Sequence, residues 1–395
     1  MIIINWIERE LEIWADATLE RSLRESSPVC EAPGYTESRG RLLLNMSSND
    51  YLGLAQHPGI IDTMRKALLT EGAGSGASRL VTGNRPPYSH LEASLADWQN
   101  REAALVFANG YMANSGVISA LVNRGDVVFS DQLNHASIVD GIILSRAEHA
   151  RYRHNDMEHL RSLLQRYQDK RRKLIVTDAV FSMDGDQAPL LELASIKREY
   201  GAMLMVDEAH SGGIYGLRGE GLCHELGMQN DVDIHMGTFS KSFGVYGAYI
   251  CGTHTLIRWL VNKARPFIYS TALPPSVVAG ISKALVLIQG EHWRRERLYE
   301  ASRLFRSALC TAGFTIAIGD SPIVPVLVGD NATALRFSSA LESAGIAAAA
   351  IRPPTVPDGT ARIRFSLSAA HTDIELTDAA EQIRTIGLQL GVLHS

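Results

Sequence analysis

Between about residues 50 and 280, short apolar runs alternate with longer segments whose apolar residues recur at helical spacing. The runs are continuous rather than alternating in polarity, which is typical of strands covered by helices on both faces. A chain with this pattern folds into an α/β domain whose sheet is mostly parallel. We expect strands at 104–107, 127–129, 174–177 and 202–206, and helices at 88–99, 111–122 and 190–200.

The two ends of the chain follow other patterns. Residues 1 to about 25 carry apolar side chains at mainly helical spacing and predict an amphipathic helix. A long helical stretch at 285–309 leads to a C-terminal region that mixes strand and helix, as in an α+β domain. The expected parts are an N-terminal helix and extension at 1–45, a large α/β domain at 46–284 and a small α+β domain at 285–395.

The composition argues against several classes of protein. The net charge of −5 gives no reason to expect nucleic acid binding. No run approaches the ~20 apolar residues of a membrane span, and the N-terminus lacks the basic and long apolar regions of a signal peptide. The four cysteines are scattered without metal-ligand spacing, which favours a reduced, cytoplasmic protein and predicts no metal site.

One aspartate and one lysine stand out near the ends of expected strands. Asp207 follows the apolar run 202–206, and Lys241 comes 34 residues later among small residues. This separation allows two strand ends to converge after a crossover. Pyridoxal phosphate (PLP) requires an amine to hold its aldehyde and a carboxylate to pair with its pyridine nitrogen. The pair therefore favours a PLP site over an exposed lysine and an ordinary strand-terminal aspartate.

Other strand ends carry residues that suit the same cofactor. Gly110 opens a helix whose N-terminus could hold a phosphate. His135 could lie on the ring and exchange a proton, and Ser182 could donate a hydrogen bond to the phenolic oxygen. His210 is placed to reach that oxygen, and the hydroxyl of Thr238 suits a phosphate. Each residue alone is compatible with an ordinary turn, but their shared location at strand ends favours the cofactor site.

Two competing motifs are incomplete. The glycine-rich run at 72–76 is not followed by Gly-Lys-[Ser/Thr], which argues against a nucleotide phosphate loop. No Gly-x-Ser-x-Gly sequence supports a serine hydrolase.

Longer stretches of the chain resemble the α-oxoamine synthases, PLP enzymes of the aminotransferase-like fold type I. The resemblance extends from about Asn45 to His371, most of the chain. It implies a large domain with a mostly parallel sheet plus a smaller α+β C-terminal domain. The matching stretches are 47–54, 151–156, 180–186, 269–275, 350–357 and 359–364.

The resemblance also implies roles for individual residues around the cofactor. Lys241 matches the Schiff-base lysine, Asp207 the partner of the pyridine nitrogen and His135 the stacking histidine, with His210 as a fourth catalytic residue. Ser270 and Thr271 match residues that reach the phosphate of a neighbouring subunit in a homodimer. The implied cofactor-binding residues are Gly110, Tyr111, His135, Ser182, Asp207, His210, Thr238, Lys241, Ser270 and Thr271.

On the substrate side, the resemblance implies that Arg364 binds the amino-acid carboxylate as a bidentate fork. The other matching substrate positions are Arg24, Asn49, His135 and Thr355. The Arg-Pro-Pro-Thr-Val-Pro run at 352–357 favours the branch that condenses L-alanine with a pimeloyl thioester, on acyl carrier protein or coenzyme A, in biotin synthesis.

Two departures from that branch leave alternatives open. Glu208 stands where the branch commonly has a second Asp, and Gly212-Gly213 replaces a more usual Gly-Thr-Gly. The segment 238–244 is also similar to the serine palmitoyltransferase branch. The chain could therefore be another α-oxoamine synthase, such as a glycine C-acetyltransferase or a serine palmitoyltransferase. A catalytically silent partner subunit is disfavoured, because such a subunit would not need Lys241.

Overall fold

The computed structural model describes residues 4–317 and 319–393. These residues form two compact units. Unit 1 combines the described residues up to Tyr51 and from Glu296 onward with the short segment Met183–Gly185, and unit 2 holds Leu52–Ser182 and Asp186–Arg295. The domain boundaries expected from the sequence stay a prediction.

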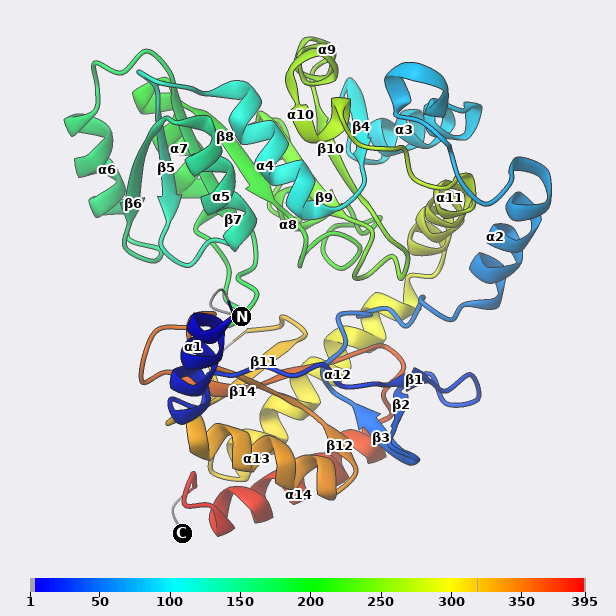
Figure 1. Ribbon diagram of the computed structural model, residues 1–395, viewed down its shortest axis with the longest axis vertical. Helices are drawn as coiled ribbons and strands as arrows, with labels where there is room; N and C mark the ends of the chain where they lie inside the picture. The colour runs from blue at the N-terminus through cyan, green and yellow to red at the C-terminus, as the bar shows by residue number, and fades with distance from the viewer. Residues whose placement is uncertain (1–3, 318, 394–395) are drawn as a thin grey trace. The chain divides into compact units, whose positions relative to one another are not determined.

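Unit 2 is built on a seven-stranded sheet (Figure 1). Its strands are β4 Ala103–Phe107, β5 Val127–Asp131, β6 Glu148–Tyr152, β7 Lys173–Asp178, β8 Met203–Asp207, β9 Ile234–Thr238 and β10 Ala248–Gly252. They are ordered β4-β10-β9-β8-β7-β5-β6. Strand β10 is antiparallel to both neighbours, and every other neighbouring pair is parallel. The mostly parallel sheet predicted from the continuous apolar runs is therefore confirmed.

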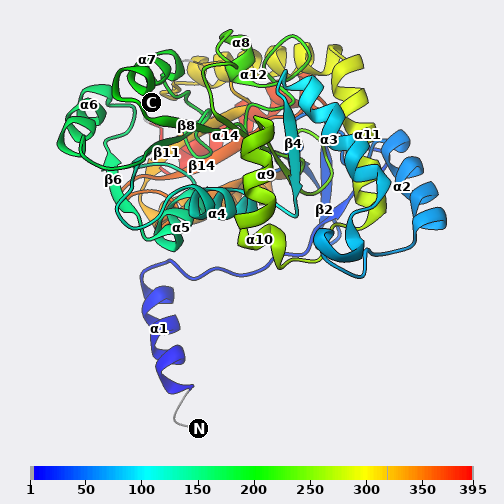
Figure 2. The same cartoon turned by 90° about the horizontal axis from the view of Figure 1, so that it is seen from above.

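Helices cover both faces of this sheet. One face packs against α4 Gly110–Leu121, α5 Ala136–Ser145, α9 His254–Lys263 and α10 Arg265–Ile268, which Figure 2 shows on one side of the strands. The remaining helices of unit 2 are α2 Pro58–Glu71, the π-helix η1 Arg79–Gly83, α3 Pro86–Trp98, α6 Met157–Arg166, α7 Leu190–Tyr200, α8 Leu222–Glu225 and α11 Pro275–Gly290.

Alternate residues of β4, β7, β9 and β10 fill the core beneath α4 and α5. Leu105 and Phe107, for example, lie in one buried cluster with Val117 of α4 and Ile138 of α5. Burying each of these large side chains contributes about 1.5–3 kcal/mol relative to leaving it in water. This packing holds the carboxyl ends of the parallel strands in register, and that is where the candidate site lies.

Unit 1 contains two smaller sheets. One has the order β1 Ser27–Pro28, β2 Tyr35–Ser38, β3 Arg41–Asn45 and β12 Ile346–Ala347; the other has the order β11 Ile323–Gly329, β14 Ala361–Ser366 and β13 Ala349–Ile351. Its helices include α1 Asn5–Asp16, α13 Asn331–Ser343 and α14 Asp373–Gln389, while α12 Trp293–Thr311 begins at the end of unit 2 and continues into unit 1. Strand and helix mix here as the sequence predicted.

Two helices differ from the sequence-based prediction. Helix α1 ends at Asp16 rather than near residue 25, because the chain turns at Thr18, whose φ is 57°. The stretch 285–309 contains the end of α11 and most of α12, because α11 stops at Gly290, and glycine is a poor helix former. Among the described residues, no helix combines the length and the apolar character needed to span a bilayer.

Candidate active site

The candidate cofactor residues of unit 2 gather at the carboxyl ends of its parallel strands. Asp207 is the last residue of β8 and is only 3% exposed. Its Oδ2 accepts a hydrogen bond from Asn114 Nδ2 at 2.7 Å, and its Oδ1 accepts one from the amide of Ala209 at 2.9 Å. These two bonds fix the orientation of the carboxylate, because each oxygen has its own donor.

His135 caps the N-terminus of α5 and is linked to Asp207 through side chains. Asn114 Nδ2 donates to Ser137 Oγ at 2.9 Å, and Ser137 Oγ lies 2.8 Å from His135 Nδ1. The amide of Ser137 also donates to Nδ1, so that nitrogen is an acceptor and Nε2 carries the proton of the neutral ring. Burial lowers the pKa of His135, Asp207 opposes this shift and Lys241 adds to it. The imidazole is therefore neutral at pH 7.

Lys241 lies in the loop between β9 and β10. Two main-chain hydrogen bonds close the loop. The amide of Phe239 donates to the carbonyl of Gly247 at 2.9 Å, and the amide of Gly244 donates to the carbonyl of Lys241 at 2.8 Å. The charge of Lys241 acts on His135, and it also acts on Asp178, whose pKa is raised well above its usual value by burial and by Asp207. The structure thus brings Lys241, Asp207 and His135 to one edge of the sheet.

The N-terminus of α4 provides donors for an anion. The side chain of Asn109 caps the helix by accepting from the amide of Met112 at 2.9 Å. No described residue accepts a hydrogen bond from the amide of Gly110 or Tyr111. A Cβ on Gly110 would lie 3.0 Å from Met236 Cε, so the main chain approaches β9 closely. Free amides at the positive end of a helix dipole suit a phosphate.

The remaining cofactor candidates occupy neighbouring loops of unit 2. Thr238 ends β9, and its hydroxyl donates to the carbonyl of Gly247 at 2.9 Å. Ser182 lies in the turn after β7, and His210 is buried three residues after Asp207. Ser270 Oγ lies 3.9 Å from Met112 Sδ, and Thr271 forms a β-bridge with Ser78. The roles of these residues stay predictions.

Together these groups fit PLP. The ring nitrogen needs a buried carboxylate, the aldehyde needs an amine and the phosphate needs unpaired donors, and unit 2 offers Asp207, Lys241 and the N-terminus of α4.

The residues predicted to bind the amino acid lie in unit 1. Arg364 lies in β14 and is only 6% exposed. Its Nη1 donates to Ser366 Oγ at 2.7 Å, and its Nη2 donates to Asn49 Oδ1 at 3.1 Å and to the Tyr51 hydroxyl at 3.3 Å. Asn49 therefore contacts Arg364, as two residues of one substrate site would.

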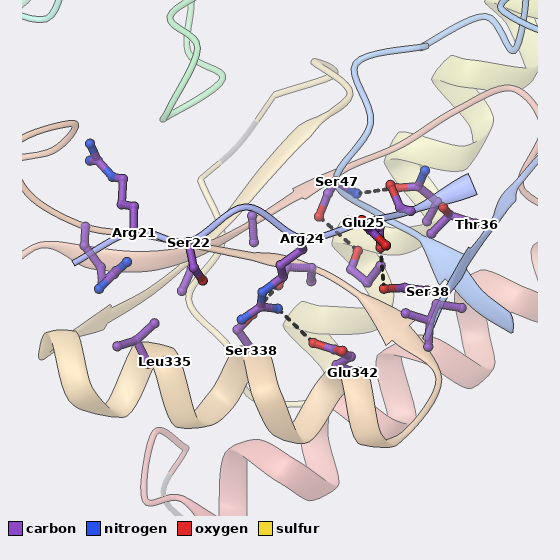
Figure 3. A pocket seen from close by; sticks show the side chains of 18 of the residues that line it. Arg21, Ser22, Arg24, Glu25, Thr36, Ser38, Ser47, Leu335, Ser338 and Glu342 are labelled. Atoms are coloured by element: carbon purple, nitrogen blue, oxygen red, sulfur yellow. Dashed lines mark hydrogen bonds and ion pairs between the residues drawn. The ribbon is translucent and has the colours of Figure 1, made fainter. Parts of the chain in front are cut away.

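Arg24 and Thr355 lie on loops of unit 1. Arg24 Nη1 pairs with Glu342 of α13 at 2.8 Å, and this pair lines a cavity of about 450 Å³ (Figure 3). Thr355 Oγ1 accepts a hydrogen bond from Arg21 at 3.1 Å, and the peptide bond between Pro353 and Pro354 is cis. Arg21 and Arg352 line the same cavity as Arg24, and so do Glu20 and Glu25, so its wall carries charges of both signs.

Sequence reasoning missed several residues that support the site. Asn114 joins Asp207 to Ser137, and Asp178 Oδ2 accepts from the amide of His135 at 2.8 Å. Asn114 was missed because its burial within 113–118 of α4, which requires a partner for the amide, is seen only in the structure. Arg21 was missed because nothing in the sequence places it beside Thr355.

Comparison with known proteins shows the family of the chain. Residues 41–383 match the family model "Aminotransferase class I and II". An 8-amino-7-oxononanoate synthase of Anaeromyxobacter dehalogenans is 52% identical over 368 residues, 93% of this chain and 92% of that protein.

Two solved structures are also similar to this chain. A serine palmitoyltransferase variant of S. paucimobilis, with PLP and myriocin bound, is 33% identical, with a TM-score of 0.92 over 99% of this chain and 98% of that one. The 8-amino-7-oxononanoate synthase of Francisella tularensis is 28% identical, with a TM-score of 0.76 over 87% of this chain and 97% of that one.

The chain belongs to the class I and II aminotransferase family of PLP-dependent fold type I enzymes. Within that family it is an α-oxoamine synthase, an acyltransferase, as the sequence motifs indicated.

Proposed function

We propose that this chain catalyses the reaction of an 8-amino-7-oxononanoate synthase. In this reaction L-alanine condenses with a pimeloyl thioester, and carbon dioxide and the thiol are released. The main support is the 52% identity to the Anaeromyxobacter dehalogenans enzyme over nearly the whole of both chains. The placement of Lys241, Asp207 and His135 at one edge of the sheet adds to it.

Unit 2 supplies the groups that would hold PLP and move the proton at Cα of alanine. When bound, the cofactor withdraws electrons from Cα and so stabilises negative charge there. Lys241 would hold the cofactor through its amine and, once released by alanine, take the Cα proton. Asp207 would keep the pyridine nitrogen protonated, because its carboxylate is buried and held by Asn114.

His135 would act as a proton donor during loss of carbon dioxide. The hydrogen bond from the amide of Ser137 leaves the proton of the neutral ring on Nε2, so this nitrogen can donate. Exclusion of water would matter at this step, because water at the site would protonate carbon at the wrong time.

Unit 1 supplies the groups proposed to bind the two substrates. Arg364 would bind the carboxylate of alanine with its planar fork, next to Asn49. Thr355 and Arg24 would contact the acyl chain. The cavity around Arg24 has a lining of mixed charge, and its guanidinium groups could pair with the free carboxylate of a pimeloyl group.

The partners and location are proposed in the same way. We infer a homodimer in which Ser270 and Thr271 complete the neighbouring phosphate site, with the pimeloyl group carried by acyl carrier protein or coenzyme A. The free state of the four cysteines is compatible with a cytoplasmic location.

The test offers L-alanine, glycine and L-serine in turn with pimeloyl, acetyl and palmitoyl thioesters, and measures carbon dioxide and free thiol. We expect efficient turnover only with L-alanine and the pimeloyl thioester. Turnover confined to serine with the palmitoyl thioester would instead assign the chain to the branch of its 33% identical structural relative. No turnover by a PLP-loaded protein with any pair would indicate a silent subunit.

A further inference from the structure

A second polar cluster lies in unit 2 directly behind the end of β8. It consists of Glu208, Cys223 and His235, which are 1%, 0% and 0% exposed. One donor atom from each residue lies within 4.8 Å of the other two. Because the three residues come from separate segments of the chain, their sequence spacing showed no metal motif.

The carboxylate of Glu208 is the centre of this cluster. Its Oε1 accepts from the amide of Cys223 at 3.0 Å and from Ser211 Oγ at 3.2 Å, while its Oε2 lies 3.2 Å from His235 Nδ1. A Cβ on Gly221 would come within 2.4 Å of Oε1, so glycine is needed there for the main chain to approach the carboxylate. The carboxylate is therefore rigidly placed.

The two nitrogens of His235 face different acceptors. Nε2 lies 2.8 Å from the carbonyl of Gln229, and a carbonyl can only accept, so Nε2 carries a proton. Nδ1 faces a carboxylate, which leaves two arrangements. Either a proton lies between Nδ1 and Glu208, on whichever of the two groups, or the two groups share a metal cation. Histidines that bind metals commonly donate their other N–H to a backbone carbonyl, as His235 does.

We propose that Glu208, Cys223 and His235 bind one structural zinc ion. Carboxylate, thiolate and imidazole are all zinc ligands, and their combination with a thiolate favours zinc over calcium or magnesium. Binding releases two protons to solvent, one from the thiol and one from between His235 and Glu208, so one carboxylate and one thiolate balance the two positive charges of the ion.

A fourth ligand would be a water molecule or His224. The ring of His224 lies 6.1 Å from that of His235, and no described residue hydrogen-bonds its buried Nδ1. The ion would hold Glu208, the residue that follows Asp207, and so the end of β8. This site is additional to the proposed function and does not depend on the choice of substrate.

The experiment uses the full-length, untagged, PLP-loaded protein, incubated with Zn²⁺ and dialysed to remove loose ions. Elemental analysis should find about one zinc per chain in the wild type and less than about a tenth of that in Cys223→Ser and His235→Gln. Cys251→Ser is the matched control, because Cys251 is buried and pairs with His235 across β9 and β10 but is outside the cluster. It should retain the zinc.

Cobalt gives an independent measurement on the same proteins. Wild type and Cys251→Ser loaded with Co²⁺ should show the visible bands of four-coordinate cobalt, at longer wavelength than the cofactor absorbs, and Cys223→Ser should lose them. A folded, PLP-loaded wild type that holds no zinc after incubation would overturn the proposal and leave a proton between His235 and Glu208. Equal zinc in wild type and Cys223→Ser would overturn it too.

Discussion

The two units hold their candidate residues in different ways. In unit 2, Asp207 is buried at a strand end, and it is joined to His135 at a helix end through the buried side chains of Asn114 and Ser137. In unit 1, only Arg364 is held so firmly, whereas the side chain of Arg24 is 55% exposed on a loop. Unit 2 is thus rigid before any ligand binds, which suits a cofactor that stays. The loops of unit 1 suit substrates that bind and are released in each turnover.

Removal of Lys241 should have the largest effect. We expect Lys241→Ala to lower turnover of alanine and pimeloyl thioester at least about 10³-fold, because the amine is both anchor and base. The absorbance of the lysine-linked cofactor should disappear as well. Lys263→Ala, which changes an exposed lysine of α9 in the same unit, should leave both unchanged. A Lys241→Ala protein that keeps this absorbance would contradict the assigned anchor.

Neutralising the carboxylate behind the ring should come next. Asp207→Asn keeps the shape but removes the charge, and we expect kcat to fall about 10²–10³-fold. Asn114→Ala removes only the amide that donates to Asp207 at 2.7 Å, so its loss should be about tenfold. Steady-state kinetics of the two variants compares them. Equal effects would mean that the network, rather than the charge, carries the function of Asp207.

A substitution in unit 1 should act on substrate binding. Arg364→Lys keeps the charge but loses the planar fork, so we expect KM for alanine to rise about 10–100-fold. Arg362→Lys is the matched control on the same strand, because Arg362 bonds Asp184 and the carbonyl of Thr360. It should lower the melting temperature with little change in KM. A rise in KM for the thioester alone would place Arg364 at the acyl end instead.

The two units should also respond to pH in opposite directions. In unit 1, burial lowers the pKa of His371 to about 4, and Nδ1 accepts a hydrogen bond from the amide of Ser368. As pH falls, the imidazole of His371 is protonated in the unfolded chain before it is protonated in the folded chain. The free energy of unfolding therefore decreases between pH ~6.5 and pH 4, by about 3 kcal/mol.

In unit 2, burial favours neutral His154, but hydrogen bonds to Asp131 and Asp186 outweigh it and raise its pKa to about 10. The contribution of protonated His154 to the free energy of unfolding is complete below pH ~6.5 and is lost as pH rises toward 10. Hydrogen exchange should therefore show unit 1 opening first in acid and unit 2 in alkali. His371→Gln should flatten the acid limb and His154→Gln the alkaline limb. The same order of opening at both extremes would contradict the assignment.

The smallest effect is expected at the exposed end of unit 1. Arg24→Ala breaks a partly exposed ion pair with Glu342, so the free energy of unfolding should change by less than about 1 kcal/mol. KM for the pimeloyl thioester should rise about threefold to tenfold, with KM for alanine unchanged. Arg9→Ala on α1 is the control, and kinetics with both substrates is the measurement. An unchanged KM for the thioester would remove Arg24 from the acyl site.

Much of the fold could be predicted because its signals are local. Helix α7 spans Leu190–Tyr200, as its apolar spacing predicted, since nothing in the tertiary structure competes with that pattern. The direction of β10 could not be predicted, because a buried strand has the same continuous apolar sequence whether it is parallel or antiparallel to its neighbours. Helix α1 was predicted too long, because Leu19 and Leu23 keep helical spacing beyond the turn at Thr18.

The residues of the candidate site also differ in whether local sequence signals predict them. Lys241 and Asp207 could be found because Asp207 ends a strand and Lys241 closely follows one, and the ends of parallel strands converge. The cavity around Arg24 could not, because Arg24 and Glu342 are 318 positions apart and only tertiary packing joins them. The substrates were predicted from the family resemblance rather than from the chemistry of the residues around the cofactor, since those residues could also suit transamination.

The position of β4 at the edge of the large sheet has a consequence for synthesis of the chain. Its one strand partner is β10, and Phe107 pairs with Ala248, 141 positions later. At about 5–20 residues per second, a ribosome needs roughly 7–28 s to make that distance. During this time the apolar sequence Ala-Ala-Leu-Val-Phe has no strand to pair with. We therefore expect the nascent chain to depend on chaperones until β10 emerges, more than its final stability would suggest.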